Sequence, residues 1–279
     1  MPELPEVETT KLGIKTHLEG QTICAVRVRQ TQFRIPVPNA IEEFCAGQSI
    51  KAVLRRAKYI LLQLSHKGYV LIHLGMSGHL RIVPEQQTPQ KHDHIDLVMN
   101  NGCALRFCDP RRFGLFIYIE ENPHAHPLLK HLGPEPLTDD FNGDYLYQRS
   151  RNSIKPIKSF IMTNEIVVGV GNIYATESLF FCGLHPKTPA KLLSHAACQQ
   201  LSKEIKRILQ EAINAGGTTL KDFYSFEGKP GYFSFSLQVY GRQHQPCYHC
   251  NSPIEALNLA GRNSAFCPQC QPMPAIQKL

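Results

Sequence analysis

The sequence lacks the features that mark membrane-spanning and exported proteins. Its 279 residues contain no run of the roughly 18 uninterrupted apolar residues that a membrane helix needs. The longest candidate, residues 166–184, is interrupted by Asn172, Glu177 and several glycine and hydroxyl-bearing residues. The chain opens MPELPEVETT, without the basic start and apolar core of a secretion signal. We therefore expect a soluble cytoplasmic protein that does not contact a membrane.

Internal repeats and low-complexity tracts are also absent. Apolar residues make up 42% of the chain and charged residues 19%, so the chain has enough apolar side chains to form a packed core. Its length suggests two domains. The formal charge of +7 is uneven, because residues 151–279 hold 13 basic and 7 acidic side chains while residues 1–150 hold 17 and 16. A basic half indicates a polyanionic partner such as nucleic acid, although a solvated basic surface explains a charge of this size equally well.

Ten cysteines are present, but a cytoplasmic protein keeps its thiols reduced or bound to metal. Four of them form two CxxC pairs, Cys247 with Cys250 and Cys267 with Cys270, separated by 16 residues. Four thiolates at this spacing can close a tetrahedral shell around one structural Zn²⁺, without which so short a segment would not fold. His249 can in principle replace a cysteine, although four thiolates complete the shell without it. The other six cysteines have no ligand spacing and are interpreted as core residues.

The first 120 residues predict one helix followed by an antiparallel β-sandwich or barrel. Pro5, the acidic Glu6 and Glu8, and Gly20 mark the start and end of a helix of about four turns. Beyond residue 22 the chain breaks into short alternating or β-branched runs separated by turn signals. Examples of the expected strands are residues 23–29, 59–64, 69–74, 94–99, 104–107 and 115–119.

The second half of the chain predicts a helical domain and the cysteine module. Residues 120–145 are rich in loop signals and are interpreted as a connection. From about residue 152 to 217 the apolar period becomes helical, most clearly over 201–213, where Gly216 and Gly217 end the pattern. Asn172 precedes another helical segment, which Gly183 ends.

The N-terminus carries a candidate nucleophile. If Met1 is removed, Pro2 has a free secondary amine beside Glu3 and just before the predicted helix. The helix dipole and partial burial keep such an amine neutral near pH 7. It can then attack an aldehyde-like carbon and form a cationic Schiff base, with Glu3 transferring protons. The alternative is that Pro2 and Glu3 only lead into the helix.

Seven segments in order resemble bacterial formamidopyrimidine-DNA glycosylase (the Fpg family), which excises oxidised purines. The match runs from residue 2 to about residue 271, and seven motifs in sequence are highly specific. The segments are MPELPEVET, Arg55-Arg-Ala-Lys58-Tyr, His73-Leu-Gly-Met-Ser-Gly78, Lys91-His-Asp-His94, Asp109-Pro-Arg-Arg-Phe-Gly114, Val167-Val-Gly-Val-Gly-Asn-Ile-Tyr174 and the four-cysteine module.

The resemblance implies roles for individual residues. Pro2 attacks C1′ of a flipped nucleotide, Glu3 acts in protonation and ring opening, and Lys58 assists base release or the first elimination. Met76, Arg111 and Phe113 match the residues that fill the hole left in the duplex. For Met76 and Phe113 the alternative is ordinary core or hairpin packing.

Further DNA contacts follow from the same resemblance. Asn172 matches a phosphate-binding residue of a helix-two-turn-helix, although it would also serve as a plain helix N-cap. Arg262 matches a zinc-finger arginine that grips phosphates and takes part in the final elimination. His92, beside Lys91, matches a phosphate contact, with solvated polar residues as the alternative. The family's lysine run is replaced here by a segment with Arg149 and Arg151, from which Arg151 is the candidate.

The resemblance also sets the expected division of the chain. Residues 1–133 form an N-terminal β-sandwich catalytic domain, 134–150 a linker, 151–235 a helix-two-turn-helix DNA-binding domain, and 236–271 a β-hairpin zinc finger. The segment that begins at Gly217 resembles the loop that senses the damaged base. The expected fold class is therefore α+β and multidomain.

The expected function is a bifunctional DNA glycosylase and AP lyase of base excision repair. It would excise 8-oxoguanine and formamidopyrimidines from double-stranded DNA through a Schiff base at Pro2 and cleave the strand by β,δ-elimination. It would act as a monomer in the bacterial cytoplasm, at the nucleoid. The first alternative is an endonuclease VIII-type enzyme for oxidised pyrimidines, which Leu4 and Phe113 argue against. The second is a non-enzymatic zinc protein that binds DNA, which the presence of Pro2, Glu3 and Lys58 argues against.

Overall fold

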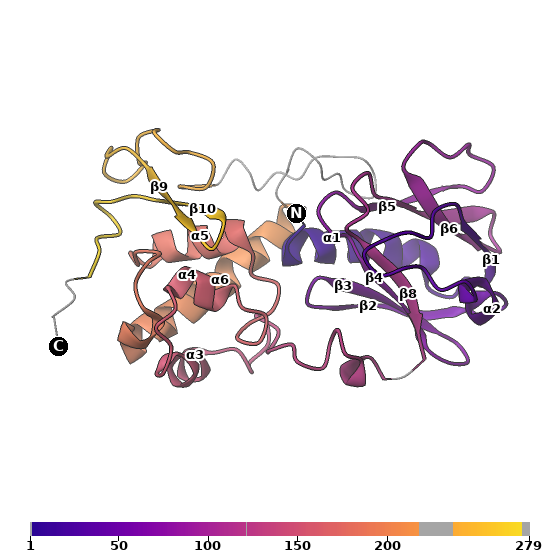
Figure 1. Ribbon diagram of the computed structural model, residues 1–279, viewed down its shortest axis with the longest axis horizontal. Coiled ribbons are helices and arrows are strands. Elements are labelled where there is room, and N and C mark those ends of the chain that lie inside the picture. Colours follow the sequence, from indigo (N-terminus) through magenta and orange to yellow (C-terminus); the bar gives the residue numbers. More distant parts are fainter. Residues whose placement is uncertain (1, 121, 218–236, 275–279) are drawn as a thin grey trace. The chain divides into compact units, whose positions relative to one another are not determined.

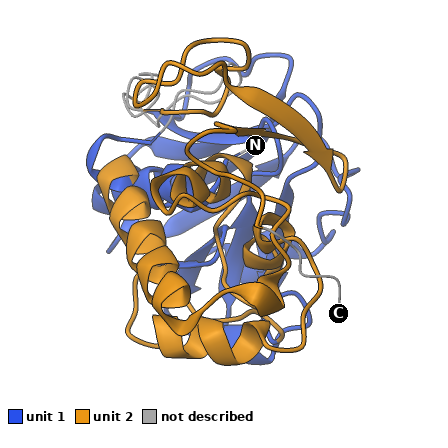
Figure 2. Ribbon diagram, turned by 90° about the vertical axis from the view of Figure 1, so that its left-hand side faces the viewer, with its two compact units in different colours: residues 1–130, 213–232 blue, residues 131–212, 233–279 orange. Residues whose placement is uncertain are grey.

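The computed structural model describes residues 2–120, 122–217 and 237–274 (Figure 1). The chain divides into two compact units, one of residues 1–130 and 213–232 and the other of residues 131–212 and 233–279 (Figure 2). Among the described residues, no helix is long and apolar enough to cross a membrane.

The first unit begins with helix α1 (Leu4–Leu18), as the sequence predicts. Pro5 lies in its first turn, where a missing backbone N–H costs nothing, and Gly20 follows its end at a φ of +82°. Val7, Ile14 and Leu18 are buried along one face of the helix and join the core of the unit. This packing anchors the helix whose first residues carry the chain's N-terminus.

Two four-stranded antiparallel sheets form the rest of this core, which confirms the predicted sandwich. In one sheet the strand order is β1-β6-β7-β5, and in the other it is β2-β3-β4-β8. Phe107 of β7 and Phe116 of β8 are both fully buried, with ring centroids 5.9 Å apart, so the two sheets meet at this pair. The strands are β1 (Ile23–Val28), β2 (Ile50–Arg56), β3 (Tyr59–Leu64), β4 (Tyr69–His73), β5 (His79–Pro84), β6 (Asp93–Met99), β7 (Cys103–Cys108) and β8 (Leu115–Ile119).

Three elements of this unit are not among the strands and helices that the sequence analysis singles out. Strand β2 ends in Arg55 and Arg56, and β5 carries Arg81, so neither has a continuous apolar run. Both are fixed by pairing, β2 with β3 and β5 with β7, which the local pattern does not reveal. The third is the short helix α2 (Ile41–Cys45), which covers the core with Ile41 and Cys45.

The second unit holds the longer helices of the C-terminal half. Helix α6 (His195–Asn214) is amphipathic and buries Leu201, Ile205, Ile208 and Leu209, as the apolar period predicts. Helix α5 (Asn172–Phe181) is preceded by α4 (Ile157–Ile161) and is followed by Gly183 at a φ of +63°. The short 3₁₀ segments Pro123–Ala125 and Ala190–Leu192 lie in the first and second unit respectively.

Helix α3 (Gly143–Ser150) lies within residues 134–150, the range that the sequence analysis interprets as a linker. The side chain of Asn142 caps this helix by accepting a hydrogen bond from the Tyr145 N–H at 2.9 Å. Leu146 is fully buried, so the helix packs as part of the second unit. The apolar pattern of a helix this short is too brief to stand out beside the surrounding loop signals.

A two-stranded hairpin, β9 (Glu255–Leu259) and β10 (Arg262–Phe266), lies between the two cysteine pairs and confirms the expected β-hairpin module. Its turn contains Ala260 and Gly261, both at positive φ. Strand β10 lies against helix α5 within the same unit. Phe180 of α5 packs into the apolar cluster around Cys247 and Cys267, so the hairpin and its cysteines share a small core with this helix.

Candidate nucleic-acid interface and active site

Pro2 and Glu3 lie directly before α1, and both are buried. Glu3 is the N-cap of the helix and forms a reciprocal capping box with Glu6, in which the Glu6 carboxylate accepts from the Glu3 N–H at 2.8 Å. The helix dipole therefore starts beside the Pro2 nitrogen. A Cβ at Gly217, where the predicted lesion-sensing segment begins, would lie 3.3 Å from Glu6 Oε1. The other residues of that segment, from 218 on, lie outside the described residues.

Lys58 lies in the two-residue turn between β2 and β3, after Ala57 at a φ of +53°. Arg55 fixes this turn, because its Nη1 donates to the Ala57 carbonyl at 2.9 Å. Its Nε donates to Glu8 of α1 at 2.6 Å. The turn that carries Lys58 is thereby tied to the helix that carries Pro2 and Glu3.

A cavity of about 290 Å³ lies in the same unit, and its lining includes Arg34, Tyr59, His73 and Phe113. Burial, together with the positive charges of Lys58 and Arg34, lowers the pKa of His73 to about 4. His73 is therefore neutral at physiological pH, and its Nδ1 accepts from the Gly75 N–H at 3.0 Å. The site thus places an uncharged imidazole near the Lys58 ammonium.

Met76 and Phe113 occupy two turns of the first unit and are exposed, with 37% and 49% of their surfaces accessible. The guanidinium of Arg111 lies 4.9 Å from the centroid of the Phe113 ring. This exposure argues against core packing for Met76 and Phe113, whereas hairpin packing, the other part of that alternative, is not tested by it. Half-buried His92 precedes β6, in the same unit.

Asn172 is the first residue of α5, while Gly171 is the N-cap, so the plain N-cap alternative for Asn172 is wrong. Its amide oxygen accepts from Lys158 Nζ at 2.6 Å, and its amide nitrogen donates to the Asn263 carbonyl at 3.1 Å. Lys158 is 1% exposed and also donates to Ser264 Oγ at 2.6 Å. One buried lysine thus joins α4, the start of α5 and strand β10.

Arg262 is exposed at the start of β10, next to Asn263. A cavity of about 190 Å³ lies beside it, with Lys158, Ser159 and Leu259 in its lining. The exposed arginine and the N-terminal end of α5 belong to the same unit and offer cationic and N–H groups of the kind that bind phosphate.

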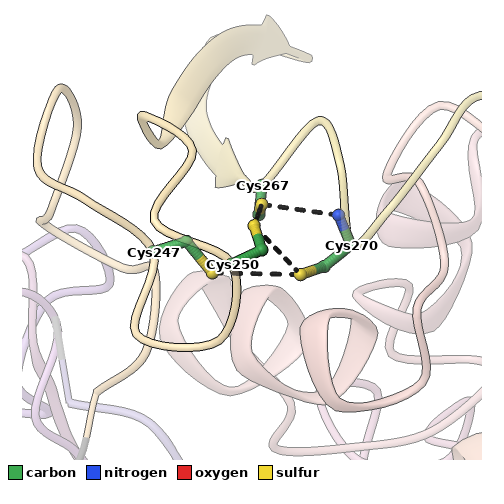
Figure 3. Close-up of side chains that lie close together, drawn as sticks. All are labelled: Cys247, Cys250, Cys267 and Cys270. Atoms are coloured by element: carbon green, nitrogen blue, oxygen red, sulfur yellow. Dashed lines mark hydrogen bonds between the residues drawn. The ribbon is translucent and has the colours of Figure 1, made fainter.

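The four sulfur atoms of the cysteine module lie within 4.8 Å of one another (Figure 3). The Sγ–Sγ distances are 3.9 Å for Cys247 and Cys270, 3.4 Å for Cys250 and Cys267, and 3.6 Å for Cys250 and Cys270. A tetrahedral zinc with Zn–S bonds of about 2.3 Å needs sulfur atoms about 3.8 Å apart. The four thiols therefore fit one structural Zn²⁺. His249 is not part of this cluster, and its ring lies against Phe180 at a centroid distance of 5.0 Å.

Three family models cover most of the chain. They are the formamidopyrimidine-DNA glycosylase N-terminal domain over residues 1–116, its H2TH domain over 132–224, and the zinc finger found in FPG and IleRS over 245–272. The chain belongs to the formamidopyrimidine-DNA glycosylase family. It is accordingly a DNA glycosylase of base excision repair with the AP lyase activity of this family, and it contains one structural zinc.

Individual members of the family are similar over nearly their whole length. The formamidopyrimidine-DNA glycosylase of Legionella pneumophila subsp. pneumophila strain Philadelphia 1 is 63% identical over 273 residues, which are 98% of this chain and 99% of the relative. That of Escherichia coli O6:H1 is 53% identical over 271 residues, 97% and 100% of the two chains.

Solved structures of the family share the fold. The MutM (Fpg) protein of Thermus thermophilus is 36% identical, with a TM-score of 0.87 over 97% of this chain and 98% of that one. The Lactococcus lactis Fpg in complex with DNA containing an abasic site is 31% identical, with a TM-score of 0.90 over 97% and 100% of the chains.

The predicted family residues are divided between the two units. The first holds Pro2, Glu3, Lys58, Met76, His92, Arg111 and Phe113, and the second holds Arg151, Asn172, Arg262 and the four cysteines. Arg151 lies at the end of α3, where its guanidinium donates to the Leu193 carbonyl at 2.6 Å and stacks on Tyr147. Its bonds within the chain fix the guanidinium in place.

Sequence reasoning missed two buried charged residues that organise the second unit. One is Lys158. The other is Glu177 of α5, whose carboxylate accepts three backbone N–H groups from residues 238–240 at 2.8 to 3.1 Å. Burial raises the pKa of Glu177, although those three N–H groups oppose the change. A charged residue at an otherwise apolar helical position was the available signal for Glu177.

Proposed function

We propose that Pro2 is the nucleophile of the glycosylase and lyase reactions. Its nitrogen attacks C1′ of the damaged nucleotide as the glycosidic bond breaks, and the base leaves with a proton. Opening of the sugar ring then gives a cationic Schiff base between Pro2 and C1′. The observation that carries this assignment is the buried pair Pro2 and Glu3 at the start of α1, which supplies a secondary amine, once Met1 is removed, and a carboxyl group on the next residue.

Glu3 and Lys58 transfer the protons in this scheme. Glu3 protonates the sugar ring oxygen as the ring opens, since its carboxyl group adjoins the nucleophile. Lys58 assists departure of the base or removal of the C2′ proton, after which the 3′ phosphate leaves in the β-elimination. A second elimination releases the 5′ phosphate, and Arg262 assists this step by holding the phosphate. The hydrogen bonds from Arg55 to Glu8 and to the Ala57 carbonyl hold the turn that carries Lys58 in a fixed position relative to α1.

The substrate is double-stranded DNA with an oxidised purine, namely 8-oxoguanine or a formamidopyrimidine. The target nucleotide leaves the helix because its C1′ is inaccessible within the stack, at a cost of a few kcal/mol. Met76, Arg111 and Phe113 fill the space it leaves. Their exposure on adjoining turns supports this role, because an apolar side chain that intercalates must be available at the surface.

Phosphate contacts hold the duplex. Asn172 and Arg262 bind backbone phosphates from the second unit, and His92 binds one from the first. Arg151 contributes positive charge beside helix α3. The substrate is chromosomal DNA, so the enzyme acts in the bacterial cytoplasm at the nucleoid. It acts as a monomer, because one copy of the chain contains all of these residues.

Borohydride trapping tests this function directly. The reagent reduces a Schiff base to a stable amine, so an active enzyme becomes covalently attached to its DNA. We expect trapping on duplexes with 8-oxoguanine or an abasic site and none on undamaged DNA. Preferential trapping on oxidised pyrimidines would support the endonuclease VIII-type alternative. Binding to the abasic duplex without trapping would support the non-enzymatic zinc protein.

A further inference from the structure

Asp109 is fully buried between the two turns that carry Met76 and Phe113. Its Oδ1 accepts a hydrogen bond from the Ser77 hydroxyl at 2.8 Å, and its Oδ2 accepts one from the Gly114 N–H at 2.8 Å. Ser77 follows Met76 in sequence, and Gly114 follows Phe113. A single carboxylate therefore binds the residue that follows Met76 in sequence and the residue that follows Phe113.

Arg111 is included in the same arrangement. Its backbone N–H donates to the Ser77 hydroxyl oxygen at 3.2 Å, so Ser77 bridges Asp109 and Arg111. The carbonyl of Asp109 accepts from the Arg112 N–H at 3.2 Å and from His94 Nε2 at 2.9 Å. The His94 contact anchors the Asp109 backbone to strand β6. All of these residues belong to the first unit.

The two turns also touch through their backbones. A Cβ at Gly75 would lie 2.5 Å from the Phe113 carbonyl carbon, and Gly75 has a φ of +62°. A Cβ at Gly114 would lie 2.6 Å from the Phe107 ring and 2.8 Å from the His73 carbonyl oxygen. No side chain fits at either position, so the turns are packed against each other and not separated by solvent.

We propose that Asp109 is a positioning residue that holds Met76, Arg111 and Phe113 in a fixed arrangement relative to one another, so that the three side chains enter the duplex together. This inference rests on the proposed function, in which these three residues fill the space left by the flipped nucleotide. A side chain that is ordered before binding loses little conformational entropy on insertion. Loosening the carboxylate link therefore impairs extrusion of the base and leaves the chemistry at Pro2 intact.

Two substrates separate these steps. Excision of 8-oxoguanine from a duplex requires extrusion and insertion, whereas cleavage at an abasic site in single-stranded DNA requires neither. Ser77→Ala removes the bridge from Asp109 to the Met76 turn and to Arg111 while leaving the Asp109 bond to Gly114. Asp109→Ala removes the whole link. Ser65→Ala is the matched control, because Ser65 Oγ also accepts a backbone N–H, that of Ser49 at 3.0 Å, in another part of the unit.

We expect Ser77→Ala to slow single-turnover duplex excision by about 10- to 100-fold, the effect of misplacing a group by about 1 Å. Its cleavage of single-stranded abasic DNA should stay within about twofold of the unaltered enzyme, and Ser65→Ala should change neither rate. A 2-aminopurine next to the lesion should show delayed unstacking in Ser77→Ala only. Asp109→Ala, if it folds, should reproduce the Ser77→Ala pattern with a larger loss.

Two results would overturn the inference. One is duplex excision by Ser77→Ala at the unaltered rate, and the other is an equal loss on both substrates, which indicates general damage to the fold. Failure of the proposed function is distinguishable from either, because the unaltered enzyme would then leave single-stranded abasic DNA uncut.

Discussion

Arg55 donates a hydrogen bond from Nε to the Glu8 carboxylate at 2.6 Å and so connects the β2–β3 hairpin to helix α1. Both side chains are largely buried, with 11% and 17% of their surfaces exposed. The same guanidinium holds the Ala57 carbonyl, directly before Lys58. The pair thereby sets the distance between the turn that carries Lys58 and the helix start that carries Pro2.

Breaking this pair should slow catalysis more than it weakens binding. Arg55→Met removes the charge and the hydrogen bonds to Glu8 and to the Ala57 carbonyl, which frees the Lys58 turn, and we expect excision to fall by about 10- to 100-fold. Lys11→Met is the control, because Lys11 also binds Glu8, at 2.6 Å, but does so from within helix α1. Single-turnover excision and duplex affinity are measured for both variants. Equal rates for the two variants would refute a positioning role for Arg55.

Glu3→Gln should suppress base excision and preserve the helix start. Glutamine keeps the side-chain oxygen that serves the capping box but cannot transfer a proton. General acid–base catalysis contributes about 10²- to 10⁴-fold, so excision should fall within that range while lesion binding changes by only a few-fold. The measurement is single-turnover release of 8-oxoguanine. Near-normal release would reduce Glu3 to a capping residue.

Zinc removal should weaken DNA binding although no cysteine takes part in the chemistry. Chelation or Cys247→Ser should unfold the module around β9 and β10, and with it Arg262. Arg262→Ala should weaken binding with normal zinc content. It should also reduce the slope of log affinity against log salt by about one, since one phosphate contact is lost.

A binding titration at several salt concentrations, with zinc measured in parallel, tests this pair of variants. Lys203→Ala, an exposed lysine on α6, controls for the loss of one positive charge. If Arg262→Ala binds with the affinity and salt slope of the unaltered protein, the arginine does not hold the DNA backbone.

The neutral state of His73 gives stability a defined pH dependence. Burial, together with the charges of Lys58 and Arg34, lowers its folded pKa to about 4, while an unfolded histidine has a value of about 6.5. Between these values the unfolded state binds a proton that the folded state does not. Above about pH 6.5 the titration of His73 therefore costs the folded state nothing. As the pH decreases from 6.5 towards 4, the free energy of unfolding falls by up to about 1.4 kcal/mol per pH unit.

His73→Gln removes this term, so the free energy of unfolding should fall less steeply between pH 6.5 and 4.5 than in the unaltered protein. Urea denaturation across this range measures the two slopes, with exposed His131→Gln as the control. Identical slopes for His73→Gln and the unaltered protein would show that His73 titrates in the folded state as it does in the unfolded chain.

Local patterns predicted the elements with continuous apolar periods. Helix α1 with its Pro5 and Gly20 boundaries, the long helix α6 and strands such as β3 and β4 follow from sequence alone. Strand β2 and helix α3 were not predicted, because pairing with β3 and the burial of Leu146 stabilise them. These are tertiary effects that a short window of sequence does not contain.

The candidate site shows the same limit. The cysteine spacing alone predicted the zinc cluster, because all four ligands come from two short motifs. Residues that act across long separations were missed. Lys158 and Ser264 are 106 positions apart in the chain, and Asp109 and Ser77 are 32 positions apart. The sequence around Lys158 and around Asp109 contains no pattern that identifies the hydrogen-bond partner of either residue, so only the folded structure reveals these links.

The most direct test of the proposed mechanism is whether the Pro2 amine forms the covalent bond to DNA. Enzyme with a free Pro2 N-terminus is compared with enzyme whose N-terminus carries an uncleaved tag, and with Pro2→Gly, using borohydride and a duplex containing 8-oxoguanine. Lesion binding is measured in parallel. We expect a trapped adduct whose DNA maps to Pro2 by peptide mass, and strongly reduced trapping in the other two proteins with binding retained. Trapping and strand cleavage at the unaltered rate by the tagged enzyme would contradict the assignment of Pro2 as the nucleophile.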